Sequence, residues 1–110
     1  MTRLRTAALV GNPNAGKSAL FNALTGARQK IANYPGVTVE RKAGRLVLPS
    51  GEPVELTDLP GSYALDASSP DEEVTRRVIF GEFPGEAKPE VLVIVLDAFF
   101  AVFFTEIGWG

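Results

Sequence analysis

The sequence has no cysteine and no histidine. Their absence excludes disulfide bridges, metal sites built on thiolate or imidazole ligands, and nucleophiles activated by a neighbouring histidine. A chain without cysteine is compatible with a reducing compartment.

A strong charge of one sign and a long apolar run are also lacking. The net charge is −2, the pI is about 5.1 and no block of lysine or arginine stands out, which argues against a general nucleic-acid surface. The longest apolar stretch, Val91 to Phe104, is interrupted by Asp97 and falls short of the roughly 20 residues that a membrane-spanning helix needs. The apolar residues that follow the basic N-terminal residues end at Val10, so we expect no signal peptide. From the charge and the short apolar stretch we expect no nucleic-acid partner and no membrane span.

The composition is that of one small globular domain, with 110 residues of which 45% are hydrophobic. Apolar patterning and turn residues predict alternating strands and helices, and therefore the α/β class. Pro49-Ser50-Gly51 predicts an antiparallel hairpin between the second and third strands, and Ser69 before Pro70 predicts a capped helix start. The predicted strands cover residues 5–10, 41–48, 54–57 and 90–96, the predicted helices cover 17–24 and 70–80, and a long loop covers 28–39.

The most informative segment is Gly11 to Ser18, which reads Gly-Asn-Pro-Asn-Ala-Gly-Lys-Ser and matches the phosphate loop G-x-x-x-x-G-K-[ST]. It lies between a predicted strand and a predicted helix, where glycines let backbone N–H groups surround a diphosphate at the positive end of the helix dipole. We expect Lys17 to bind the β- and γ-phosphates and the Ser18 hydroxyl to ligate Mg²⁺. The nucleotide contacts predicted here are Gly11, Asn12, Pro13, Asn14, Ala15, Gly16, Lys17, Ser18 and Ala19.

A second candidate segment is Asp58-Leu59-Pro60-Gly61, at the end of a predicted strand. The Asp58 carboxylate is placed to hold a magnesium-bound water, and the Gly61 amide to approach a γ-phosphate, because no side chain obstructs it. Aspartate, proline and glycine are also ordinary turn formers, so the segment by itself favours a plain turn. Together with the phosphate loop it favours a nucleotide switch, with contacts from Asp58, Leu59, Pro60 and Gly61.

The long loop holds a third candidate segment, Gly36-Val37-Thr38. The Thr38 hydroxyl can complete the magnesium shell and its amide can touch the γ-phosphate, so that the loop orders with a triphosphate. The alternative is a β-branched residue that opens the next strand. The candidate catalytic residues are thus Lys17, Thr38 and Gly61, and the candidate magnesium ligands are Ser18, Thr38 and Asp58.

Four segments together resemble the N-terminal G domain of the bacterial ferrous iron transport protein B family. They are the phosphate loop, Asn33-Tyr34-Pro35-Gly36-Val37-Thr38-Val39-Glu40, Asp58-Leu59-Pro60-Gly61-Ser62-Tyr63 and Ser69-Pro70-Asp71-Glu72. The resemblance covers roughly residues 5–98. It implies a P-loop NTPase fold of the Ras-like type, incomplete at its C-terminal side, with a mostly parallel sheet and one antiparallel hairpin strand. The chain then divides into a partial G domain, residues 1–98, and a divergent phenylalanine-rich tail, residues 99–110.

The resemblance also implies a function, which is binding and magnesium-dependent hydrolysis of GTP in the switch domain of a ferrous iron transporter. The implied partners are GTP or GDP and the transporter's own helical and membrane domains, with the full-length protein at the cytoplasmic face of the inner membrane and this fragment soluble and cytoplasmic. Asn14 would hold K⁺ beside the phosphates, in place of an arginine finger, although an asparagine can also simply tolerate a turn. Ser62 stands where Ras-like switches carry a glutamine, so we expect slow turnover, about 10⁻⁴ to 10⁻² s⁻¹.

The sequence departs from the family pattern after Asp97-Ala98, where a phenylalanine-rich segment replaces the polar continuation and no Asn-Lys-x-Asp element follows. Guanine specificity therefore rests on the resemblance alone. Two alternatives stay open: another GTPase of the translation-factor type, against which the acidic composition counts, and a truncated module without catalysis that binds nucleotide or acts only in interactions. With no pore segment, this chain is not expected to move iron itself.

The predicted strand at 90–96 is expected to lie at a sheet edge with bare backbone groups. We expect the phenylalanine-rich tail to cover this edge as a short helix. The alternatives are an altered reading frame without an evolved partner and a membrane-surface helix, for which the tail lacks a basic face.

Overall fold

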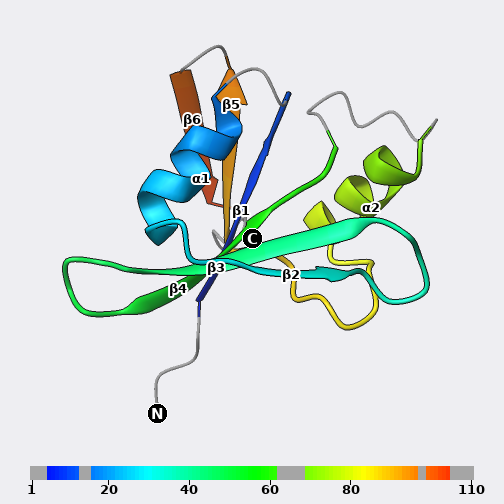
Figure 1. The fold of residues 1–110 in the computed structure, drawn as a ribbon, viewed down its shortest axis with the longest axis horizontal. Coiled ribbons are helices and arrows are strands. Elements are labelled where there is room, and N and C mark those ends of the chain that lie inside the picture. The colour runs from blue at the N-terminus through cyan, green and yellow to red at the C-terminus, as the bar shows by residue number, and fades with distance from the viewer. Residues whose placement is uncertain (1–4, 13–15, 62–68, 97–98, 105–110) are drawn as a thin grey trace, which may run out of the picture.

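The structure, a computed structural model, describes residues 5–12, 16–61, 69–96 and 99–104. Its strands form one six-stranded sheet in the order β2-β3-β4-β1-β5-β6, and the two helices lie on opposite sides of it (Figure 1). None of the helices in the described ranges is long and apolar enough to cross a membrane. The elements are β1 (Arg5–Gly11), α1 (Lys17–Thr25), β2 (Lys30–Asn33), β3 (Glu40–Val47), β4 (Pro53–Asp58), α2 (Pro70–Ile79), β5 (Val91–Leu96) and β6 (Phe99–Phe104).

The central strand β1 explains why helices cover both faces of the sheet. Successive side chains of a strand point to opposite faces, and on β1 both sets are apolar. Leu9 packs in a cluster with Phe21 of α1, whereas Ala8 and Val10 pack in a second cluster with Val78 of α2. β1 pairs in parallel with β4 on one side and with β5 on the other, and its residues from Ala7 to Gly11 are buried.

Most of the predicted elements are present, and the α/β class is confirmed. β3 and β4 form the antiparallel hairpin, with Val47 opposite Pro53. α2 begins at Pro70 as predicted, and the Ser69 hydroxyl accepts a hydrogen bond of 3.2 Å from the Glu72 amide. Such a cap satisfies one of the amides that the first turn of a helix leaves without a partner.

The segment predicted as one long loop contains a strand. β2 lies within residues 28–39 and pairs antiparallel with β3, from Lys30 opposite Ala43 to Asn33 opposite Glu40. All of its side chains are exposed, so the residues lack the alternation by which a half-buried strand is recognised. The sheet is consequently less parallel than predicted: two of its pairings are parallel and three are antiparallel.

The tail covers the edge of β5, but as a strand rather than the helix that was predicted. β6 runs antiparallel to β5, from Val91 opposite Phe104 to Leu96 opposite Phe99. Aromatic and β-branched residues favour strands, and pairing satisfies backbone groups of β5 that a helix would leave open. Residues 105–110 lie outside the described ranges.

Candidate functional site

The phosphate loop joins the end of β1 to the start of α1. Gly16 is the N-cap of α1, with φ 92° and ψ 12°, a left-handed conformation that favours glycine. Its carbonyl accepts a hydrogen bond of 3.0 Å from the Leu20 amide, so the helix begins directly behind it. Asn12 and Ala19 are exposed, and the predicted contacts Pro13, Asn14 and Ala15 lie outside the described residues.

Gly11, the first glycine of the motif, is packed against the neighbouring strand. A Cβ atom built on it would lie 2.5 Å from the carbonyl oxygen of Val95 in β5, and its φ is 156°. A side chain at this position would therefore have to push β5 away from β1.

Lys17 is buried and directed at the carboxyl end of β4. Its Nζ lies 2.7 Å from Oδ1 of Asp58, both side chains are 7% exposed, and Nζ also donates a hydrogen bond to the carbonyl of Leu59. The ion pair is close, yet Oδ1 itself accepts no hydrogen bond of good geometry from the described residues. A buried carboxylate oxygen in this condition has an unused acceptor capacity, which suits a water held by a cation.

A cavity of about 240 Å³ lies beside this ion pair. Lys17, Ser18, Asp58, Leu59 and Pro60, all predicted as site residues, line it together. Three further residues line it that were not predicted as site residues, Glu40, Lys42 and Asp71. Lys42 could have been found from the hairpin, because it lies directly opposite Asp58 in the β3–β4 register.

The third predicted segment is not part of this cavity. Gly36, Val37 and Thr38 are exposed in the turn between β2 and β3 and do not line it. The turn is closed by a hydrogen bond of 2.9 Å from the Tyr34 amide to the Val39 carbonyl. Thr38 must therefore move towards the cavity before it can serve as a metal ligand.

Tyr34 anchors one end of this turn in the core beneath α2. It is 1% exposed, and its ring meets that of Phe83 edge-on with a centroid distance of 5.3 Å. The Tyr34 hydroxyl has no hydrogen-bond partner among the described residues. Burial raises the pKa of this hydroxyl above its usual value, and the negative charge of Glu86 raises it further.

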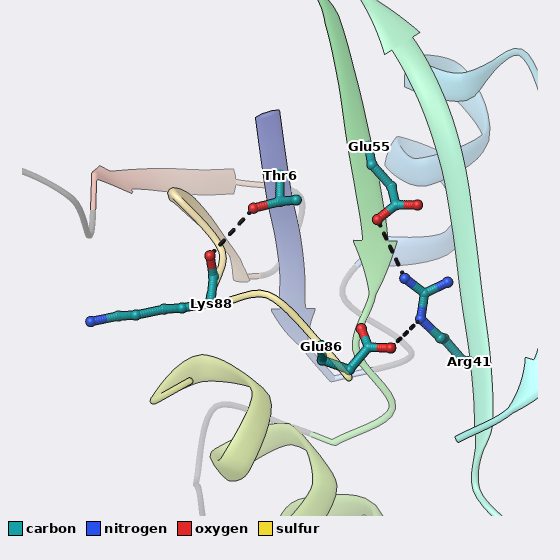
Figure 2. Close-up of polar contacts among 5 residues, drawn as sticks. All are labelled: Thr6, Arg41, Glu55, Glu86 and Lys88. Atoms are coloured by element: carbon teal, nitrogen blue, oxygen red, sulfur yellow. Dashed lines mark hydrogen bonds and ion pairs between the residues drawn. The ribbon is translucent and has the colours of Figure 1, made fainter. Parts of the chain in front are cut away.

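Arg41 ties β3 to the segment that follows α2 (Figure 2). Its Nε donates to Oε2 of Glu86 at 2.9 Å, and its Nη2 donates to Oε1 of Glu55 at 3.3 Å. Partial burial alone would lower the pKa of Arg41, but the charges of Glu86 and Glu55 outweigh it, so the pKa is raised. On the far side of the same segment, Thr6 donates a hydrogen bond of 3.3 Å to the Lys88 carbonyl.

A larger hollow of about 350 Å³ opens elsewhere, beside β2 and β3. Basic side chains surround it, among them Arg28, Lys30 and Arg45. None of the predicted site residues lines it. The smaller cavity is therefore the candidate site, because that is where the phosphate-loop lysine and the Asp58 carboxylate meet.

The chain matches the family model described as ferrous iron transport protein B over residues 5–101. The chain is a member of this family. It is 50% identical over 91 residues to the Fe(2+) transporter FeoB of Methanocaldococcus jannaschii, covering 83% of the chain and 13% of the relative. It is 47% identical over 90 residues to FeoB of Leptospira biflexa, covering 82% of the chain and 12% of the relative. The chain thus spans about an eighth of the length of these FeoB relatives.

Solved structures of FeoB share the fold. The G domain of T. maritima FeoB superposes with a TM-score of 0.69 at 44% identity, over 84% of this chain and 55% of that one. The cytosolic domain of the same FeoB in its GMPPNP form gives a TM-score of 0.70 at 43% identity, over 81% of this chain and 33% of that one. The P-loop GTPase fold expected from the sequence is therefore confirmed, and membership of the FeoB family disfavours a translation-factor-type GTPase.

Proposed function

We propose that this chain is part of the GTP-binding G domain of a ferrous iron transporter and hydrolyses GTP slowly with Mg²⁺. The observation that carries the proposal is the meeting of Lys17, Ser18 and Asp58 around one cavity at the carboxyl ends of β1 and β4. FeoB structures from T. maritima described as GDP and GMPPNP forms support guanine nucleotide as the ligand.

Lys17 would bind the phosphates by exchanging its present partners. Its ammonium group now contacts the Asp58 carboxylate and the Leu59 carbonyl, and phosphate oxygens would take their place. The charge that builds up on the β–γ bridging oxygen during hydrolysis then lies next to a cation in a site partly shielded from water. Lys17, Thr38 and Gly61 remain our proposed catalytic residues, and residues 11–19, 36–38 and 58–61 remain our proposed nucleotide contacts, with Ser18, Thr38 and Asp58 as the proposed magnesium ligands.

The residues present fit a magnesium ion. Ser18 and Asp58 line one cavity, and hydroxyl and carboxylate oxygens are ligands that suit Mg²⁺. Among the described residues no group of three acidic side chains gathers as a metal site, so phosphate oxygens would have to complete the coordination. A bound Mg²⁺ would neutralise charge on the β- and γ-phosphates. Thr38 would join it after the turn between β2 and β3 has moved.

The wider setting is also a proposal. We assign residues 1–98 to a partial G domain and residues 99–110 to a divergent tail, and we expect partners in the helical and membrane domains of a full-length transporter. In such a protein the G domain would lie on the cytoplasmic side of the membrane.

Calorimetric titration of the chain with GDP, GMPPNP, ADP and a non-hydrolysable ATP analogue in Mg²⁺ tests the proposal. Micromolar binding of the two guanine nucleotides, with at least tenfold weaker adenine binding, is expected. Equal weak binding of all four would favour a non-catalytic module, and no binding would refute the nucleotide site. A Lys17→Met variant should lose binding to both guanine nucleotides by more than about a hundredfold, because it removes the charge that meets the phosphates.

A role of Asn14 in holding K⁺ is a separate proposal. Single-turnover hydrolysis of GTP is expected to be faster in KCl than in NaCl at equal ionic strength, and Asn14→Ala should remove the difference. Equal rates in the two salts, or a variant that keeps its potassium response, would contradict it. A wild-type rate well above one per second would contradict the expectation of slow turnover.

A further inference from the structure

The backbone amide of Gly61 is bonded to a side chain of α2. Its N–H donates a hydrogen bond of 2.7 Å to Oγ1 of Thr75. Gly61 is buried and Thr75 is 0% exposed, so water does not compete for this bond. Nothing in the sequence indicated Thr75, which lies in the second turn of α2.

The contact is also tight. A Cβ atom on Gly61 would lie 2.8 Å from Oγ1 of Thr75, 3.0 Å from the carbonyl oxygen of Asp71 and 3.1 Å from Cα of Glu72. The Gly61 backbone thus rests directly on the first turns of α2, and glycine is required there by packing. The N–H cannot turn away from Thr75 unless this backbone moves.

The same segment is held from its other side. Lys17 donates to the carbonyl of Leu59, two residues earlier, and forms the ion pair with Asp58. Residues 58–61 are therefore fixed between the phosphate-loop lysine and α2.

A backbone amide carries one hydrogen, so the Gly61 N–H cannot donate to Thr75 and to a γ-phosphate at full strength at once. We propose that Thr75 is a positioning residue that holds the Gly61 amide away from the γ-phosphate and so sets the preference between GTP and GDP. The inference rests on the proposed function. A state competent to bind the γ-phosphate through Gly61 must first give up this bond, which lowers the apparent affinity for the triphosphate only. The diphosphate makes no demand on Gly61 and is unaffected.

The test compares Thr75→Val, which keeps the shape of the side chain and removes the hydroxyl, with Thr75→Ser, which keeps the hydroxyl. Affinities for GMPPNP and GDP are measured by calorimetry in Mg²⁺ on the full chain. In Thr75→Val the affinity for GMPPNP relative to GDP is expected to rise about fivefold, the equivalent of one net hydrogen bond of about 1 kcal/mol. Thr75→Ser should keep the wild-type ratio.

Thr25→Val is the matched control, since Thr25 is also a buried helical threonine whose hydroxyl donates 2.8 Å to a carbonyl, that of Phe21. It should leave the ratio unchanged. A second readout needs no nucleotide: hydrogen exchange at the Gly61 amide, followed by NMR, should accelerate in Thr75→Val and stay at the wild-type rate in Thr25→Val.

The outcomes separate the inference from the function on which it rests. Wild-type chain that binds neither nucleotide would refute the proposed function and the inference with it. Measurable binding with an unchanged GMPPNP to GDP ratio in Thr75→Val would refute the inference alone. Unchanged exchange at Gly61, or a shift in Thr75→Ser as large as that in Thr75→Val, would also overturn it.

Discussion

The two faces of the sheet are built differently. On the α1 face, the phosphate loop and its helix follow β1 directly, and they lie on an apolar cluster that includes Leu9, Phe21 and Leu56. On the α2 face, polar contacts join segments that are distant in the chain: Arg41 reaches Glu86, and Gly61 reaches Thr75.

The two faces therefore suit different roles. The α1 face holds the phosphate loop in one place by local connection and apolar packing, which suits a fixed anion site. The α2 face gathers the turn after Tyr34, the segment at residues 58–61 and the connection after α2 into one packed unit. A displacement of any one of these three segments will disturb contacts of the other two, and such shared contacts are how a switch becomes cooperative.

The Lys17–Asp58 ion pair joins α1 to the segment at residues 58–61 and should show the largest effect. Lys17→Met or Asp58→Asn alone is expected to lower the free energy of unfolding by about 3 kcal/mol, because each leaves one buried charge without its partner. The double variant should recover most of this loss, since no isolated charge remains. Urea unfolding without nucleotide measures all four proteins. Additive losses would mean that Lys17 and the segment at residues 58–61 are not coupled through this pair.

Tyr34 tests whether the core beneath α2 tolerates a hydroxyl only while that hydroxyl is not ionised. Its hydroxyl has no hydrogen-bond partner in the part of the chain that the structure describes, so Tyr34→Phe should raise the free energy of unfolding at pH 7 by about 1 kcal/mol. Burial raises the folded-state pKa of Tyr34 above the unfolded value of 10.0. Its ionisation therefore does not affect the free energy of unfolding below pH 10, and this free energy falls as the pH rises above 10.

At pH 11 the wild type should have lost about 1.4 kcal/mol that the phenylalanine variant keeps. Urea unfolding at pH 7 and pH 11 on both proteins measures the difference. Parallel losses in the two proteins would show that Tyr34 ionises freely and that this part of the α2 face is open to water.

The Arg41–Glu86 bond should give the smallest effect. The side chains are 23% and 13% exposed, so a double-mutant cycle with Arg41→Gln and Glu86→Gln is expected to yield a coupling energy of about 1 kcal/mol. The matched control is Arg5–Glu52, at 57% and 28% exposure, where the coupling should be under about 0.5 kcal/mol. Equal coupling energies in the two pairs would mean that Arg41 stabilises the α2 face no more than an exposed ion pair does.

Sequence reasoning succeeded where the signal is local. The phosphate loop, the β3–β4 hairpin and the Ser69 cap are each determined by residues within one short segment, so their turn and capping chemistry could be recognised. It failed at β2, whose exposed residues show no alternation, and at β6, because a short apolar run does not distinguish a strand from a helix.

The candidate site shows the same limit. Lys17 and Ser18 were predicted from one motif that fixes their types and spacing, Asp58 was predicted from a second segment at a strand end, and the structure places all three around one cavity. The Gly61–Thr75 and Arg41–Glu86 contacts could not be predicted, because the residues of each pair lie 14 and 45 positions apart in the sequence and no motif relates them. Contacts of this kind depend on how α2 is seated on the sheet, which no local pattern specifies.

Gly11 has a consequence for how the first position of such motifs is interpreted. Because the Val95 carbonyl of β5 occupies the space that a Cβ would need, every substitution there works against strand association before any anion is present. We would expect a library of Gly11 variants to be depleted by poor folding yield, even in cells that never require nucleotide binding. Glycine would then be required at this position by the close approach of β1 and β5 as much as by the binding of a phosphate.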